Sequence, residues 1–192
     1  MHNHFNKNLN VKELIEKHKP EKIVELGADK GGNTVQLLTL AKVLTITDNS
    51  VPPGENRDSL ARAIANGNLE WVQGVSFNEL KNYDDNSMTF VSVDTDHNYM
   101  TLKLELDELY RTVKTGGIVV IHDVEKFRGI NKIHTAFRNQ QKYGNGKKYD
   151  MNLMSSEGPG YTSALLEQVE EGRWKIIKWV KESCGAAAIE KL

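Results

Sequence analysis

The sequence contains a single cysteine, Cys184, among its 192 residues. One cysteine excludes a disulfide within the chain and a zinc site built from several thiolates, and it is natural in a reducing compartment. Long apolar runs are missing as well, so no segment is expected to span a bilayer. The first residues, Met1 to His4, lack the basic and apolar regions of a signal peptide. We therefore expect a cytoplasmic protein with no membrane partner.

An excess of charge of either sign is also missing. The chain has 25 Lys and Arg against 26 Asp and Glu, a formal net charge of −1, so no global field attracts nucleic acid. Its 39% of hydrophobic residues is ordinary for a globular protein of this length. Without repeats or a linker, residues 1–192 are expected to form one domain, with poorly ordered tails at residues 1–10 and 183–192.

Predicted strands and helices alternate along most of the chain. Helices are expected over residues 11–18, 34–42, 57–65, 77–80, 100–113 and 129–140, and strands over residues 23–26, 43–48, 69–73, 88–93, 118–121, 151–154, 162–169 and 173–180. The helix that follows Tyr99 is expected to end at Thr115–Gly117, with Lys103, Glu105, Asp107 and Glu108 on its solvated face. The alternation predicts an α/β fold with a mostly parallel sheet.

The segment from Lys22 to Thr34 is expected to form a strand, a glycine-containing turn and the start of a helix. The turn carries Gly27, Gly31 and Gly32. Such a turn places free backbone N–H groups and the positive end of a helix at the carboxyl edge of a sheet, where open α/β folds bind ligands. Gly27 allows a sharp turn and the close approach of a ligand to the backbone.

The spacing of these glycines differs from that of a dinucleotide site. Dinucleotide-binding turns carry G-x-G-x-x-G, whereas this turn reads Gly27-x-x-x-Gly31. The carboxylates of Asp29 and Glu25 are ill suited to a pyrophosphate, but Glu25 is well suited to a cation. A ligand with an adenosyl group, an amino acid tail and a positive sulfonium fits this turn better.

Two further strand ends are candidates for binding the nucleoside. Asp48 follows the second strand, about twenty residues past the turn, where an acid accepts both ribose hydroxyls. Alternatively, Asp48 forms an Asx turn with Asn49 and Ser50. After the third strand, Gly74 and Ser76 would meet the adenine ring. Ser76 is also a candidate N-cap for the helix over residues 77–80, and the two roles are compatible.

Acidic and imidazole side chains follow the fourth and fifth strands. Asp94, Asp96 and His97 come after the fourth strand, and His122 and Asp123 after the fifth. Asp94 and Asp123 supply the pair of carboxylates that Mg²⁺ prefers, and His122 is a candidate third ligand, although imidazole suits a softer ion. Without a metal, the repulsion between the carboxylates requires a raised pKa or a basic neighbour. The plainer alternative is that these acids are solvated or cap the next helix.

Two segments carry a more specific resemblance. Residues 93–99 read V-D-T-D-H-N-Y, residues 116–124 read G-G-I-V-V-I-H-D-V, and Gly129-Ile130 follows. Together with E-x-G-x-x-x-G-x-x-T in the glycine turn, they resemble the D-x-D-H-x-Y, G-G-x-x-x-x-H-D and G-V pattern of one branch of class I S-adenosylmethionine-dependent methyltransferases. That branch holds the macrolide and aminocoumarin sugar O-methyltransferases and relatives of the cephalosporin-biosynthesis methyltransferase. The resemblance spans roughly residues 11–168.

This resemblance implies a Rossmann-like sandwich with helices on both faces and an antiparallel C-terminal strand. It also implies O-methylation of a small hydroxylated molecule, sugar-like or phenolic, with S-adenosylmethionine and Mg²⁺. The expected cofactor-binding residues are Glu25, Gly27, Ala28, Gly31, Asn33, Thr34, Asp48, Gly74, Ser76 and Asp94. The expected metal ligands are Asp94, His122 and Asp123. Asp96 or His97 is the expected base: His97 has the pKa nearer neutrality, and Asp96 is spaced closer to a metal-bound oxygen.

We expect the acceptor pocket to receive no contribution from an N-terminal lid or oligomerisation extension. It must come from the loops around Lys126, Tyr143 and Tyr161, or from a second copy of the chain. Two other classes of function stay open. One is a nucleotide-binding protein without catalysis, whose enzyme version is an NAD-linked oxidoreductase. The other is a nucleic-acid methyltransferase, disfavoured by the neutral charge and by the lack of an Asn/Asp-Pro-Pro-aromatic motif at the right strand.

Overall fold

The structure is a computed structural model that describes residues 9–47, 56–126, 128 and 159–192. Its helices are α1 (Val11–His18), α2 (Gly32–Leu37), α3 (Arg57–Ala65), α4 (Ser76–Glu79), α5 (Tyr99–Thr112) and α8 (Tyr161–Glu170), with a 3₁₀ turn, η1 (Leu80–Asn82), after α4. Its strands are β1 (Lys22–Leu26), β2 (Lys42–Thr47), β3 (Leu69–Gln73), β4 (Met88–Val93), β5 (Val113–His122), β6 (Trp174–Val180) and β7 (Ala186–Lys191).

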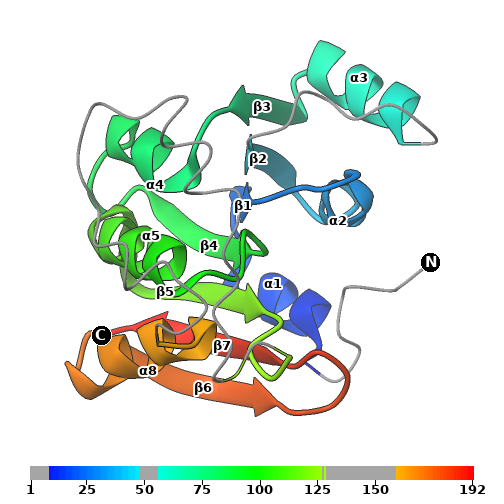
Figure 1. Cartoon of the computed structure of the whole chain (residues 1–192). Helices are drawn as coiled ribbons and strands as arrows, with labels where there is room; N and C mark the ends of the chain where they lie inside the picture. Colours follow the sequence, from blue (N-terminus) through cyan, green and yellow to red (C-terminus); the bar gives the residue numbers. More distant parts are fainter. Residues whose placement is uncertain (1–8, 48–55, 127, 129–158) are drawn as a thin grey trace.

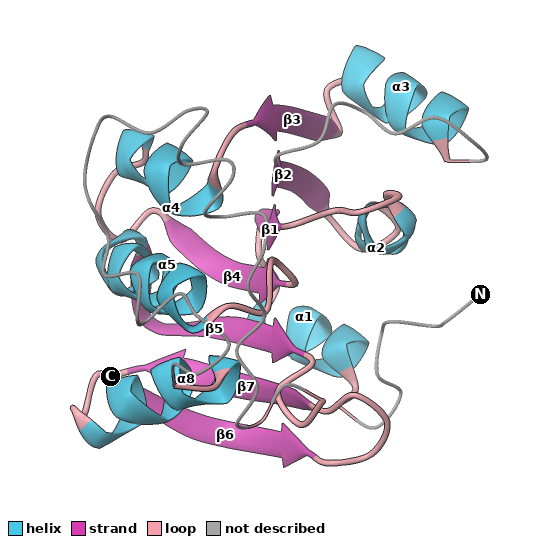
Figure 2. Ribbon diagram, in the orientation of Figure 1, coloured by secondary structure: helices cyan, strands magenta, loops and turns pink. Residues whose placement is uncertain are grey.

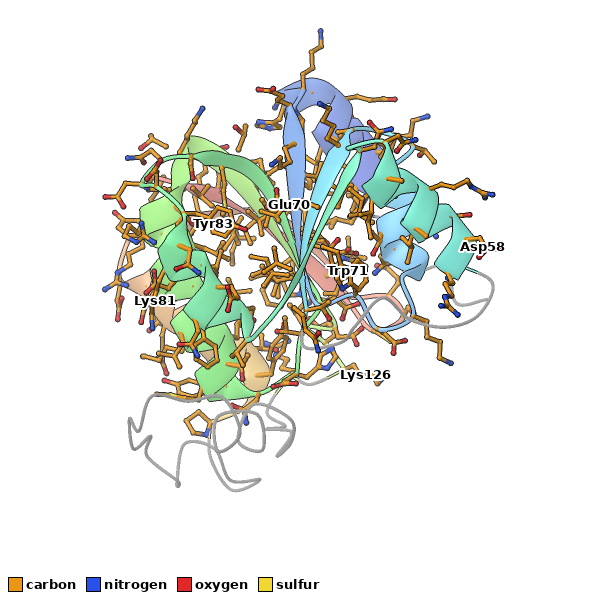
Figure 3. The ribbon with its side chains drawn as sticks, turned by 90° about the horizontal axis from the view of Figure 1, so that it is seen from above. Asp58, Glu70, Trp71, Lys81, Tyr83 and Lys126 are labelled. Carbon is orange, nitrogen blue, oxygen red and sulfur yellow. The ribbon has the colours of Figure 1, made fainter. Side chains whose placement is uncertain are left out.

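The strands form one seven-stranded sheet in the order β3-β2-β1-β4-β5-β7-β6. The first five strands in this order pair in parallel, and β7 runs antiparallel to both of its neighbours. Helices α1, α2 and α3 pack on one face, and α4, α5 and α8 on the other. Figure 3 shows the strands as a central layer between these helices. The predicted Rossmann-like sandwich is confirmed.

The central strands are apolar on both sides because helices cover both faces. In β4, Phe90 packs in the cluster under α1 to α3, whereas Val91 and Val93 pack in the cluster under α5 and α8. Several elements begin and end where the sequence pattern predicts, namely α1, α3, β3 and β4. Among the described residues no helix is both long and apolar enough to cross a membrane.

Two predictions near the C-terminus are wrong. The strand expected over residues 162–169 is helix α8, whose buried residues Tyr161, Leu165 and Gln168 recur at helical spacing. The tail expected to fray contains β7, and Ala186 to Ala188 are fully buried between β5 and β6. Alanine has little intrinsic preference for strands, so this strand depends on its neighbours rather than on propensity.

Some element boundaries also differ from the prediction. Helix α5 ends at Thr112, and Gly116 lies within β5, where the pairing with β4 shifts between Met88 and Phe90. Helix α2 has only six residues, so its dipole is shorter than the predicted helix over residues 34–42 would supply. At the N-terminal end, Leu9 is buried and Asn10 caps α1. Residues 1–8, the helix over 129–140 and the strand over 151–154 lie outside the described residues.

Candidate active site

The acidic strand ends that the sequence singles out lie at one edge of the sheet. Leu26 pairs with Val93, and the backbone N–H of Asp94 donates to the carbonyl of Leu26 at 2.9 Å. Val93 in turn pairs with Ile121, two residues before Asp123. The tips of β1, β4 and β5 are therefore adjacent, as predicted. Asp48 lies outside the described residues, so its role toward a ribose stays a prediction.

Gly27 occupies the point where the tips of β1 and β4 pass closest. Its φ is +81°, the left-handed region in which only glycine is free of strain. A Cβ atom at this position would lie 2.2 Å from the carbonyl oxygen of Asp94. The sharp turn is confirmed, and the group that approaches Gly27 so closely is the protein's own backbone. Gly27 thus sets how near the glycine turn lies to Asp94.

Glu25 is a buried carboxyl at the end of β1, with 1% of its surface exposed. One oxygen, Oε2, accepts from Thr34 Oγ1 at 2.6 Å and from Thr45 Oγ1 at 2.9 Å. The other, Oε1, has no hydrogen-bond partner among the described residues, and neither has the buried Oδ1 of Asn33. Burial raises the pKa of Glu25 to about 7, although the two hydroxyls act to lower it.

Unpartnered buried oxygens cost about 1–3 kcal/mol each, and native structures leave few of them. Glu25 Oε1 and Asn33 Oδ1 belong to the strand end and helix start on either side of one turn. A ligand that carries N–H groups or a positive charge would satisfy both oxygens. These two acceptor oxygens therefore fit the positively charged amino acid and sulfonium part of the expected cofactor. Thr34, expected to contact that cofactor, uses its hydroxyl to hold Glu25.

The other residues expected to bind the cofactor lie in the same turn or at the tip of β3. Ala28 is buried, and Gly31 takes a φ of +75° as the residue before α2. Gly74 donates its N–H to the carbonyl of Thr47 at 2.8 Å, which joins the tips of β2 and β3. A Cβ atom on Gly74 would lie 2.4 Å from Oε1 of Glu79, so a larger residue there would displace that side chain.

His97 lies between the two aspartates of the cluster. Its Nε2 is 2.9 Å from Oδ2 of Asp123 and 3.5 Å from Oδ1 of Asp94. Burial lowers the pKa of His97, but the bonds to Asp123 and Asp94 outweigh it and raise the pKa above 6.5. Burial likewise acts to raise the pKa of Asp123, but the bond from His97 lowers it below 3.8. His97 is therefore the basic neighbour that the carboxylate pair requires when no metal is bound.

His122, the expected metal ligand, does not join this cluster. Its Nε2 lies 3.3 Å from Oγ of Ser92. Side chains alternate across a strand, so His122 faces the same side as Val120, toward α1 and α2, and away from Ile121. The group that could hold a metal ion among the described residues is Asp94, His97 and Asp123, whose ligand atoms lie within 4.8 Å of one another. The predicted ligand set needs this correction.

Tyr161 and Lys126 also lie near the cluster. Tyr161 is fully buried at the start of α8, in helix rather than in the expected loop, and its ring meets that of His97 edge-on at 5.4 Å. Burial raises the pKa of Tyr161 well above 10.0, and the charges of Glu105, Asp94, Asp123 and Asp96 act in the same direction. Lys126, labelled in Figure 3, is exposed, and its charge helps to lower the pKa of Asp123. Tyr143 lies outside the described residues.

Ser76 contacts a residue that the sequence analysis misses. Ser76 is the first residue of α4, where Val75 is the N-cap and no side chain caps the helix. Its hydroxyl donates instead to Oε1 of Glu105. Glu105 is fully buried, not on the expected solvated face of α5. The signal is in the sequence, because position 105 falls on the apolar stripe that includes Leu102 and Leu109.

The two buried glutamates predict how stability depends on pH. Burial raises the pKa of Glu25 to about 7 and that of Glu105 to about 8, from 4.5. Between pH 4.5 and 8 the folded chain keeps protons that the unfolded chain has lost, so the free energy of unfolding falls as pH rises. The raised pKa of His97 acts in the same direction above pH 6.5. We expect a slope of up to about 1.4 kcal/mol per pH unit for each group.

Thermal unfolding measured from pH 4.5 to 9 checks this prediction. The midpoint should fall across the range, and Glu105→Gln, which cannot ionise, should fall less steeply. An equal slope in the variant would contradict the assignment of the raised pKa to Glu105.

Comparisons with known proteins agree with this geometry. Residues 24–124 match a family described as Methyltransferase domain. No curated protein matches the sequence. Solved structures with the same fold include cofactor-bound Rv0187 from MTB, 15% identical, with a TM-score of 0.67 over 97% of this chain and 80% of that one. SAH-bound methyltransferase PaMTH1 from Podospora anserina is 14% identical, with a TM-score of 0.65 over 94% and 75%.

A third structure is the O-methyltransferase from Bacillus cereus in complex with SAH. It is 15% identical, with a TM-score of 0.63 over 97% of this chain and 81% of that chain. Identities this low show a common fold and nothing finer, whereas the family match covers more than half of the 192 residues. The chain belongs to the family described as Methyltransferase domain and has its Rossmann-like fold.

Proposed function

We propose that the protein is an S-adenosylmethionine-dependent methyltransferase that acts on a hydroxyl group of a small molecule, sugar-like or phenolic. One observation carries the proposal. The unpartnered carboxyl oxygen of Glu25 and the cluster of Asp94, His97 and Asp123 lie at the adjoining tips of β1, β4 and β5. The proposed site for a positively charged donor and the proposed site for removing a proton from an acceptor would thus lie side by side.

On the cofactor side, Glu25 and Asn33 would bind the positively charged amino acid part, and Ala28 and Gly31 would form the turn around it. The cofactor, when bound, supplies a methyl group on a positively charged sulfur. The SAH in the Podospora anserina and Bacillus cereus structures supports this choice of ligand. Contacts of Asp48 with the ribose and of Gly74 and Ser76 with the adenine stay predictions.

On the acceptor side, a hydroxyl group must lose its proton as the methyl group arrives. Of the two candidate bases, the geometry favours His97 over Asp96. His97 would act as the base in its neutral form, and the imidazolium that forms when it takes the proton would be stabilised by both Asp123 and Asp94. A carboxylate that orients and charges a histidine base in this way is a common arrangement in enzymes. General-base catalysis of this kind is typically worth about 10²–10⁴ in rate.

The same cluster is a candidate divalent-cation site. Asp94, His97 and Asp123 offer two carboxylates and one imidazole within ligating distance of one another. A divalent cation there would polarise the acceptor hydroxyl. Mg²⁺ prefers oxygen ligands, and an imidazole in the set favours a softer ion such as Mn²⁺. Several finer points stay predictions. They are the choice of Mg²⁺, the sugar-enzyme branch, the cytoplasmic location, the lack of nucleic-acid and membrane partners, and an acceptor pocket completed by a second copy of the chain.

Calorimetric titration with SAH tests the proposal. We expect saturable binding of SAH and none of NADH, because the glycine spacing disfavours a dinucleotide. Glu25→Gln keeps the side-chain size but removes the charge, so it should weaken SAH binding by about ten-fold, the effect of a loss of about 1.4 kcal/mol. Glu70→Gln, an exposed acid at the far edge of the sheet, is the control. No binding of SAH would overturn the proposal, and binding of NADH instead would favour an oxidoreductase.

A further inference from the structure

Glu105 is a carboxyl group placed in an apolar part of the molecule. It lies on α5 with none of its surface exposed, in the stripe that includes Leu102, Leu106 and Leu109. Burying a carboxyl group is costly unless hydrogen bonds compensate. A leucine at this position would continue the stripe at no such cost. The carboxyl therefore calls for an explanation beyond packing.

The two oxygens of Glu105 reach two different loops. Oε1 accepts from the hydroxyl of Ser76, which follows β3, and Oε2 accepts from Oγ1 of Thr95 at 3.0 Å, which follows β4. In the sheet, β3 and β4 are separated by β2 and β1. No strand pairing between β3 and β4 fixes the distance between these two loops. The side chain of Glu105 makes that connection from α5.

The two loops belong to the two halves of the proposed site. Ser76 is a predicted adenine contact. Thr95 directly follows Asp94, which belongs to the cluster of Asp94, His97 and Asp123. The inference therefore rests on the proposed function. A nucleoside held at one loop and a reacting group held at the other must keep a fixed separation, since a displacement of about 1 Å can reduce the rate about 100-fold.

We infer that Glu105 is a positioning residue that ties the loop after β3 to the loop after β4, so that the nucleoside half of the methyltransferase site keeps a fixed place relative to its acidic half. Glu105 acts through Ser76 and Thr95. It is not a catalytic residue.

The protonation state of the Glu105 carboxyl group indicates which substitutions test its role. Burial raises the pKa of Glu105 to about 8, so at neutral pH the group is largely the uncharged acid. The charged groups that act on it are Asp96 and His97 from the loop before α5, and its own charge acts on Tyr161 of α8. When ionised, the carboxyl group accepts from both hydroxyls; when uncharged, one oxygen instead donates its proton to one of them, and a glutamine amide offers the same donor and acceptor. Methionine has a similar size and offers neither.

The experiment compares Glu105→Gln, Glu105→Met and the wild type by SAH titration at pH 7 and at a temperature where all are folded. Glu105→Met should weaken SAH binding at least about ten-fold, and Glu105→Gln should stay within about three-fold. Glu108→Gln, an acid on the same helix that pairs with Arg111, should bind as the wild type does. A purely structural role would move the unfolding midpoint and leave the SAH affinity of the folded protein unchanged.

Thr95→Val completes the test, and its result does not depend on whether Glu105→Met folds. This variant removes only the hydroxyl in the loop after β4, and we expect it to weaken SAH binding several-fold. In the Glu105→Met background the same change should have no further effect. Wild-type affinity in Thr95→Val or in folded Glu105→Met, or equal losses in the Gln and Met variants, would overturn the inference. Failure of the wild type itself to bind SAH would instead overturn the proposed function.

Discussion

Replacing His97 with glutamine is expected to lower the rate of methyl transfer by about 10²–10⁴, the usual contribution of a general base. The affinity for SAH should stay within about three-fold, because His97 is not among the residues expected to bind the cofactor. His97 Nε2 lies 2.9 Å from Asp123 and 3.5 Å from Asp94, so the variant removes the base together with the group whose protonated form balances the two carboxylates. Single-turnover rates with a phenolic or sugar acceptor, and SAH titration, measure the two quantities.

His122→Gln is the matched control for this prediction. His122 lies at the same sheet edge, but its Nε2 is 3.3 Å from Ser92 on the other face. Its replacement should change the rate only a few-fold. A collapse of activity in His122→Gln together with normal activity in His97→Gln would contradict the cluster described here and restore the ligand set predicted from sequence.

A chelator separates the two roles open to His97. If a cation occupies the cluster, treatment with EDTA should remove the activity and Mn²⁺ or Mg²⁺ should restore it. If His97 alone supplies the charge, EDTA should have no effect on the wild type. Either result agrees with a role for His97, whereas full activity of His97→Gln with and without EDTA would contradict both.

The tips of the strands were predictable because their chemistry is local. Asp94 and Asp123 each follow a buried strand directly, Glu25 is the last residue but one of another, and parallel strands end at a common edge. Choosing between the two histidines was harder. His97 lies beside the aspartates and takes a left-handed φ of +56° in the loop after β4, and nothing in the residue types fixes that angle. The alternation of side chains along β5 turns His122 to the other face of the sheet, and this alternation is predictable from the sequence.

Glu105 and β7 show where tertiary context decides. Glu105 reads as one of several charges on a solvated helix face; its place on the apolar stripe of α5 is a sequence signal for burial, and the position of α5 over the sheet decides it. The three alanines of β7 have no strand signal of their own; β5 and β6 pair with them on either side, and their side chains pack in the apolar clusters on the two faces of the sheet. Residues of low propensity whose partners are distant in sequence are those that local patterns misassign.

The largest effect on stability is expected for Gly27→Ala. Alanine in the left-handed region costs about 1–2 kcal/mol, and Gly27 has a φ of +81°. In addition, the new Cβ would lie 2.2 Å from the carbonyl oxygen of Asp94. That atom belongs to the backbone at the tip of β4, so it cannot move without displacing the strand end. We expect a total loss above about 4 kcal/mol, in the range that marks a specific steric conflict.

Two other glycines of the same chain separate these two contributions. Gly67 has a φ of +73° with nothing within 4 Å of a Cβ atom, so Gly67→Ala should lose only the backbone cost of about 1–2 kcal/mol. Gly32 has neither a positive φ nor a close neighbour. It opens α2, so Gly32→Ala should be neutral or gain up to about 1 kcal/mol. Urea unfolding of the three variants measures these differences. If Gly27→Ala lost no more than Gly67→Ala, the contact with Asp94 would not be what requires glycine there, and the fixed spacing between the glycine turn and the acidic cluster would need another cause.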